Sequence, residues 1–127
     1  MSVPATKQAA FEAVANARGR FATEAYAFVC EALEFVQRRL AEKGRPRHVS
    51  PQELLEGVRD FGRKRFGYLG RTVFEMWGLK VSADFGDVVF DLVDAGVLAK
   101  QDEDRKEDFL GGFDFAAAFE TEFVHEE

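Results

Sequence analysis

The feature that most constrains the fold is a long apolar periodicity in the stretch FATEAYAFVCEALEFVQRRLAEK, residues 21–43. Apolar residues recur there at spacings of three and four, which predicts one long α-helix with a wide buried face. That face comprises Phe21, Ala25, Phe28, Val29, Ala32, Leu33, Val36 and Leu40, widened by Tyr26, Cys30 and Phe35. Because so broad an apolar face needs cover from other elements, we expect this helix to lie at the centre of the domain.

Length and composition predict one folded domain. The chain has 127 residues, of which 46% are hydrophobic and 14 are Phe, and a chain of this size buries roughly two thirds of its unfolded surface. No apolar run approaches the ~18 residues of a membrane span, and the first residues lack a signal-peptide pattern. A single cysteine, Cys30, excludes an intrachain disulfide and a cysteine-based zinc site. We therefore expect a cytoplasmic protein without membrane contact.

The stretch RHVSPQELLEG, residues 47–57, predicts the start of a second helix. Ser50 is a favourable N-cap, and Pro51 suits the first helical position, where its missing N–H has no consequence. Glu53 stands three residues after Ser50 and completes a capping box. Because these signals agree, we expect a helix over 51–66.

The rest of the chain alternates short helical and strand-like patterns. Further helices are expected over 6–17, 69–77 and 82–95, the last capped by Ser82 and stopped by Gly96. Two short strands are expected over 97–100 and 108–113, followed by a helix that Asp114 caps.

This order of elements is the layout of a winged helix, a helix-turn-helix followed by a β-hairpin. The expected fold class is therefore mainly α, with a helical N-terminal half packed on a winged-helix-like second half that carries a small β-hairpin. Residues 1–127 would form a single α-rich domain, with 1–46 as a helical extension and 47–127 as the winged-helix-like part and C-terminal helix. A plain helical bundle with a small hairpin is the alternative.

Charge divides the chain into a basic front and an acidic back. Residues 1–81 contain 14 Lys and Arg against 9 Asp and Glu, whereas residues 82–127 contain 3 against 14. The two parts can attract each other within one molecule or between two, and the acidic part should repel nucleic acid.

The expected recognition helix of this winged-helix layout carries four carboxylates, Asp84, Asp87, Asp91 and Asp94, and no Lys or Arg. Duplex DNA is therefore disfavoured as a partner, because affinity for DNA comes largely from neutralising phosphates. The spacing places all four on one stripe, which is either a solvated face or a docking face for a basic partner protein. No metal site is expected, because carboxylates on a straight helix do not converge into an oxygen cage.

Two groups of basic residues are candidate binding sites for negatively charged partners. Arg59, Arg63, Arg65 and Arg71 are the candidate nucleic-acid surface, although acidic residues between them favour a surface of ion pairs. Arg45, Arg47 and His48 precede a helix N-terminus and form a candidate anion-binding or enzymatic pocket. The simpler interpretation is that Arg45 and Arg47 are solvated, or pair with the acidic back, and that His48 packs at the joint between helices.

The C-terminal stripe of Phe115, Phe119 and Phe123 is too apolar to face water. It packs either on its own domain, which we favour, or on a partner chain. No catalytic constellation, cofactor motif or metal motif is recognised, and Cys30 lies among apolar residues where an inert buried thiol is expected. The leading hypothesis is a non-enzymatic protein-interaction module, with self-association of basic front and acidic back as one form of it.

Several ordered motifs resemble a family of small uncharacterised bacterial proteins, the Minf-type family. They are AYAFVCEALEFV, RHVS with QELLEG, MWG, DFG with VF, LV and AG, and FDFAAAF, which together span residues 21–119. Pro51 departs from the small residue expected there and should only strengthen the helix start. The resemblance implies a shared fold and brings no assigned reaction and no catalytic residues.

Overall fold

The computed structural model describes residues 8–45, 48–99 and 104–121, and every regular element among them is helical. The α-helices are α1 (Gln8–Arg18), α2 (Thr23–Glu42), α3 (Pro51–Phe66), α4 (Gly70–Met76) and α5 (Ser82–Asp94). Two short 3₁₀-helices, η1 (Gly67–Leu69) and η2 (Lys106–Phe109), and a π-helical turn, η3 (Ala117–Thr121), complete the set. No helix of these ranges has both the length and the apolar character that crossing a membrane requires.

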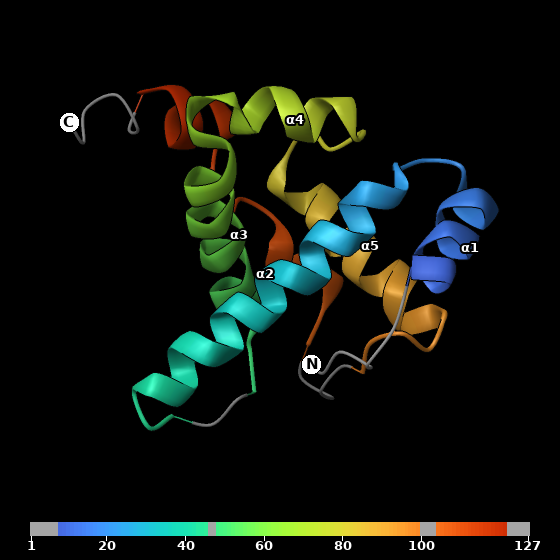
Figure 1. Cartoon of the computed structure of the whole chain (residues 1–127), viewed down its shortest axis with the longest axis horizontal. Helices are drawn as coiled ribbons and strands as arrows, with labels where there is room; N and C mark the ends of the chain where they lie inside the picture. The colour runs from blue at the N-terminus through green and yellow to red at the C-terminus, as the bar shows by residue number, and fades with distance from the viewer. Residues whose placement is uncertain (1–7, 46–47, 100–103, 122–127) are drawn as a thin grey trace.

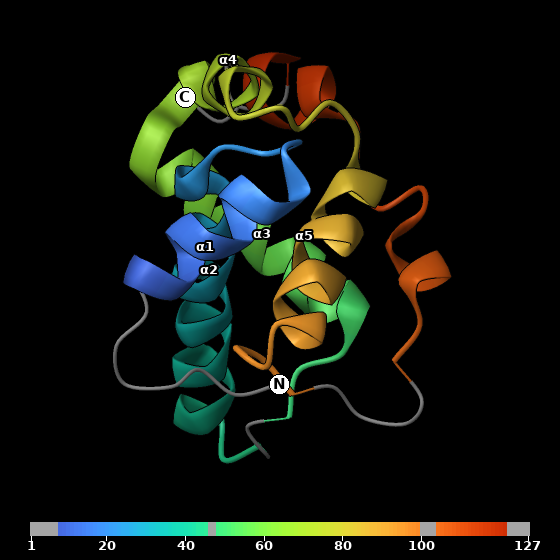
Figure 2. The same ribbon diagram turned by 90° about the vertical axis from the view of Figure 1, so that its right-hand side faces the viewer.

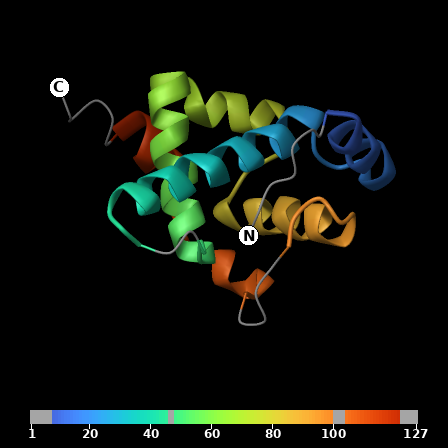
Figure 3. The same ribbon diagram turned by 60° about the horizontal axis from the view of Figure 1, so that its bottom comes forward.

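Helix α2 lies at the centre, as its apolar periodicity predicts. It contacts α1, α3 and α5 (Figure 1), and nine of its residues are buried. In the view turned by 90°, α1 and α2 lie side by side with α5 next to them (Figure 2). Helix η2 contacts both α5 and α3, and it lies below them in Figure 3. The wide apolar face of α2 is thus covered from several directions.

The core is a connected cluster of aromatic rings around Phe74 of α4. This fully buried ring has edge-to-face or tilted contacts, with centroids 5.1–6.3 Å apart, to rings from four other parts of the chain. Its neighbours are Phe28, Phe66, Trp77, Phe85, Phe115 and Phe119. Such pairs contribute roughly 0.5–1.5 kcal/mol each beyond their buried area. Phe74 therefore ties α2, α3, α5 and the C-terminal segment together.

The start of α3 is confirmed in atomic detail. The backbone N–H of Glu53 donates to Ser50 Oγ (3.2 Å), and the Glu53 carboxylate accepts from the Ser50 N–H (3.0 Å). Pro51 is the first helical residue, and Gly67, with φ of 59°, follows the last. These local hydrogen bonds need no tertiary partner, which is why the sequence alone predicts them.

The expected β-hairpin, and with it the winged-helix-like second half, is wrong. The described part of 97–100 contains no strand, because Val97 and Leu98 close the end of α5 by donating N–H bonds to Leu92 O (2.9 and 3.2 Å). Their apolar side chains are buried against the core as part of a Schellman-type helix end. An apolar pair after Gly96 therefore marked a helix stop rather than a strand.

The second expected strand, 108–113, is also absent. Ser82, which the sequence suggested as the cap of α5, is instead the first residue of that helix, and Val81 is the N-cap. Ser82 Oγ donates to Phe109 O and accepts from the Gly112 N–H, both at 2.9 Å. A side-chain hydroxyl thus satisfies the backbone groups that a strand partner would have satisfied.

Helices α2 and α3 approach each other closely at Gly57. A Cβ placed on this residue would overlap the Val36 side chain of α2. The absence of a side chain at 57 therefore sets the spacing between the two helices.

We predict that Gly57→Ala lowers the free energy of unfolding by about 1–3 kcal/mol, because overpacking outweighs the gain in helix propensity. Chemical denaturation measures the effect. Adding Val36→Ala should recover part of the loss, since it removes the overlapping group. If the loss in the double variant equalled the sum of the losses in the two single variants, the close approach would be contradicted.

Candidate functional site

The acidic stripe of α5 is neutralised within the molecule. Arg18 of α1 pairs with Asp91 (3.5 Å) and Asp94 (3.2 Å). Arg20, in the connection between α1 and α2, pairs with Asp84 (2.7 Å) and Asp87 (2.5 Å). The attraction between basic front and acidic back is therefore satisfied inside one chain at these four carboxylates, and a docking face for a basic partner at this stripe stays a prediction.

Two of these carboxylates, Asp91 and Asp84, also accept partly buried hydrogen bonds. Tyr26 of α2 is fully buried and its hydroxyl donates to Asp91 (2.8 Å). Burial, reinforced by this hydrogen bond, raises the pKa of the Tyr26 phenol far above its ordinary value. Asp84 is only 7% exposed and also accepts the backbone N–H groups of Lys80 and Val81 (2.7 and 3.2 Å), so it serves as a cap at the start of α5.

The four arginines of the expected nucleic-acid surface lie on two helices, α3 and α4. Arg71 lies on α4 and pairs with Glu75 (3.1 Å) and Glu120 (3.0 Å), and the hydrogen bond to Glu120 is the main reason that its pKa is raised. The others lie on α3: Arg63 is half-buried, Arg65 pairs with Glu31 and Arg59 pairs with Asp60.

The predicted anion site before α3 is only partly in view, since Arg47 lies outside the described residues. His48 is exposed, and Arg45 pairs with Glu53 at 3.4 Å. The capping box of Ser50 and Glu53 occupies the N-terminus of α3, and the anion site at Arg45, Arg47 and His48 stays a prediction.

The C-terminal stripe packs on its own core where it is described. Phe115 and Phe119 are 4% and 0% exposed and both contact Phe74. Asp114 caps the turn that carries them by accepting from the Ala117 N–H (2.9 Å). Phe123 lies outside the described residues. The two visible rings are therefore core residues and are not available to a partner.

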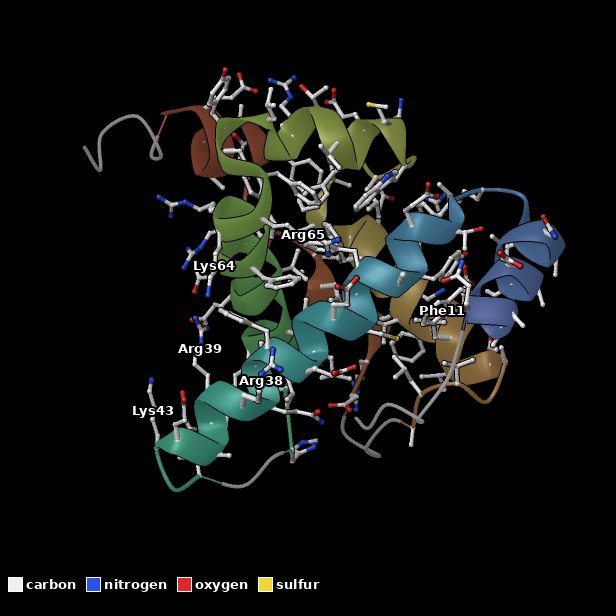
Figure 4. The ribbon with its side chains drawn as sticks, in the orientation of Figure 1. Phe11, Arg38, Arg39, Lys43, Lys64 and Arg65 are labelled. Atoms are coloured by element: carbon white, nitrogen blue, oxygen red, sulfur yellow. The ribbon has the colours of Figure 1, made fainter. Side chains whose placement is uncertain are left out.

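A different group of basic residues gathers where α2 and α3 run past each other. Five cations lie along the surface that the two helices share (Figure 4), here called the cationic face: Arg38 and Arg39 of α2, Lys43 at its C-cap, and Lys64 and Arg65 of α3. Two of them are paired with carboxylates, Arg39 with Asp60 (2.9 Å) and Arg65 with Glu31 (3.0 Å).

The other three cations of this face, Arg38, Lys43 and Lys64, are exposed and have no carboxylate partner within the described ranges. The cations near the C-terminal end of α2 complement the dipole of that helix. No sequence pattern joins them to Lys64, because that residue is distant in the chain and only the crossing of α2 and α3 brings them together.

Aromatic rings underlie the cationic face. The Arg39 guanidinium lies 4.9 Å from the Phe35 ring centroid, and Lys64 Nζ lies 5.9 Å from the same ring. Arg65 lies near two rings of α3, Phe61 and Phe66. These cation–π contacts hold the charged groups over an apolar surface without neutralising them.

The residues that the structure describes contain no candidate metal site. No group of three His, Cys, Asp or Glu side chains among them converges as metal ligands do, and Cys30 is buried in α2. No family model, curated protein or solved structure matches the chain.

We predict that Arg20→Gln lowers the free energy of unfolding by about 1–2 kcal/mol, because two charge-assisted hydrogen bonds to α5 are lost while water screens the half-exposed guanidinium. Arg38→Gln is the matched control and should change stability by less than about 0.5 kcal/mol. Urea denaturation distinguishes the two, and equal effects would contradict the role given to Arg20.

We also predict an alkaline loss of stability that depends on Tyr26. Its pKa is raised above the ordinary 10.0 in the folded chain, so above that pH the unfolded chain releases a proton that the folded chain retains. The contribution of Tyr26 to the free energy of unfolding is fully present below pH 10. It is lost as the pH rises further, by up to about 1.4 kcal/mol per pH unit. Tyr26→Phe should remove this slope, and parallel stability curves for both proteins would contradict it.

Proposed function

We propose that the protein is a non-enzymatic interaction module that binds an acidic segment of a partner protein on the cationic face. One observation carries the proposal: Arg38, Lys43 and Lys64 stand together without carboxylate partners in the described structure, although the chain has a net charge of −6. The carboxylates of α5, in contrast, are matched by Arg18 and Arg20. Unmatched charge on one face indicates a complementary partner.

A protein segment suits this face better than nucleic acid does. Glu31 and Asp60 lie within it, beside Arg65 and Arg39. A phosphate backbone presents negative charge alone and would meet these carboxylates as well as the overall negative charge. A protein segment can place groups of both signs.

Location and family belong to the proposal as well. We place the protein in the cytoplasm, where its one cysteine, a buried thiol outside any disulfide, would stay reduced. Membership of the Minf-type family remains a proposal that the motifs between residues 21 and 119 support.

The proposal predicts that reversing two charges of the face weakens binding to an acidic peptide. Lys43→Glu/Lys64→Glu should bind a fluorescent glutamate-rich peptide at least about tenfold more weakly than the parent at low salt, since each tenfold change needs only about 1.4 kcal/mol. Lys80→Glu/Arg105→Glu is the matched control, because both residues are exposed and have no carboxylate partner for their side chains within the described ranges. This control should stay within about twofold of the parent. Fluorescence anisotropy gives both affinities.

The same titration decides between partners. The proposal would be contradicted if the parent bound no peptide at low salt, or if the control variant lost as much peptide affinity as Lys43→Glu/Lys64→Glu. Tighter binding of a single-stranded oligonucleotide of equal charge would replace the protein partner with nucleic acid. Added salt should weaken binding by the parent, because exposed charges are screened.

A further inference from the structure

We infer that a hollow between the end of α2 and the start of α3 binds one carboxylate on a short aliphatic stem, a glutamate side chain of the acidic partner. The inference rests on the proposed function and names the group that anchors the partner. The hollow has a volume of about 140 Å³ and is lined by Val36, Arg39, Leu40, Lys43, Arg45, Glu53 and Glu56. Arg39 and Lys43 also belong to the cationic face, so the hollow is continuous with it.

The turn after α2 builds this hollow. Gly44 adopts a φ of 69°, a left-handed conformation that suits glycine. The chain then folds back so that the Arg45 N–H donates to Leu40 O (2.9 Å). As a result Arg45 stands beside the last turn of α2 and faces Glu53 of α3. Residues that are remote from one another in the sequence thus surround one small space.

The chemistry of the lining selects the ligand. Val36 and Leu40, 2% and 6% exposed, form an apolar floor on which methylene groups can rest. The rim carries three cations and two carboxylates. Arg39 is paired with Asp60, which lies outside the lining, and Arg45 is paired with Glu53. Lys43 is left as the rim cation without a carboxylate partner in the described structure, so one carboxylate would pair with it, whereas a neutral amide would not.

The contacts of the individual rim residues show which cation can receive a carboxylate. Glu53 is already engaged, with one carboxylate oxygen accepting from Ser50 N and the other near Arg45. Arg39 is paired with Asp60 at the edge. Lys43 has no such partner within the described ranges. Lys43 is therefore the residue that we expect to receive the carboxylate, with Arg45 opposite.

A titration followed by amide chemical shifts tests the pocket. N-acetylglutamate N-methylamide should give saturable shifts for residues 36–45 and 50–56 with an affinity no tighter than about 1 mM, since an exposed ion pair contributes little binding energy. The neutral N-acetylglutamine N-methylamide, which has the same shape, should give none. Lys43→Gln should weaken the glutamate analogue at least about fivefold, and Lys80→Gln, outside the pocket, should leave it unchanged.

Three results would overturn the inference: no saturable shift, equal shifts from the glutamine analogue, or tighter binding of inorganic phosphate. The peptide experiment separates this failure from failure of the proposed function. Peptide binding that depends on Lys43 and Lys64 without an analogue site would remove only the pocket. Saturable analogue binding without peptide binding would remove the acidic partner protein and hence the role given to the pocket.

Discussion

The packing of aromatic rings around Phe74 is the constraint on which the rest of the structure depends. Helix α4 is only seven residues long, too short to be stable on its own, yet it carries the ring that contacts the greatest variety of elements. Phe28 fixes α2 against this ring, and Phe85 fixes α5. The relative placement of α2 and α3, and therefore the cationic face between them, follows from this shared core rather than from either helix alone.

Electrostatics then divides the surface into charges that the fold uses and charges that it leaves open. Arg18 and Arg20 use the acidic stripe of α5 to hold the first two helices against the fifth. Arg38, Lys43 and Lys64 make no comparable contact in the described structure. A sequence count of charges cannot separate these two groups, because both contribute equally to the imbalance between residues 1–81 and 82–127.

What could be predicted from sequence was local. The capping box of Ser50 and Glu53 and the central position of α2 follow from residues near one another in the chain. The hairpin failed for a non-local reason: Val97 and Leu98 are apolar because they close α5, and Gly112 finds its hydrogen-bond partner in Ser82, thirty positions away. The hollow at Lys43 and Arg45 was equally out of reach, since it needs the crossing of α2 over α3.

The rings beneath the cationic face affect the entropic cost of binding a partner. Arg39 and Lys64 both lie over Phe35, so their long side chains have already lost part of the rotamer freedom that a solvated cation keeps. Immobilising such a side chain on binding costs about 0.5–1.5 kcal/mol, and part of that cost is met when the protein folds. A partner would therefore encounter a preorganised array at these two positions, and selection among partners would depend on how well their carboxylates match its fixed spacing.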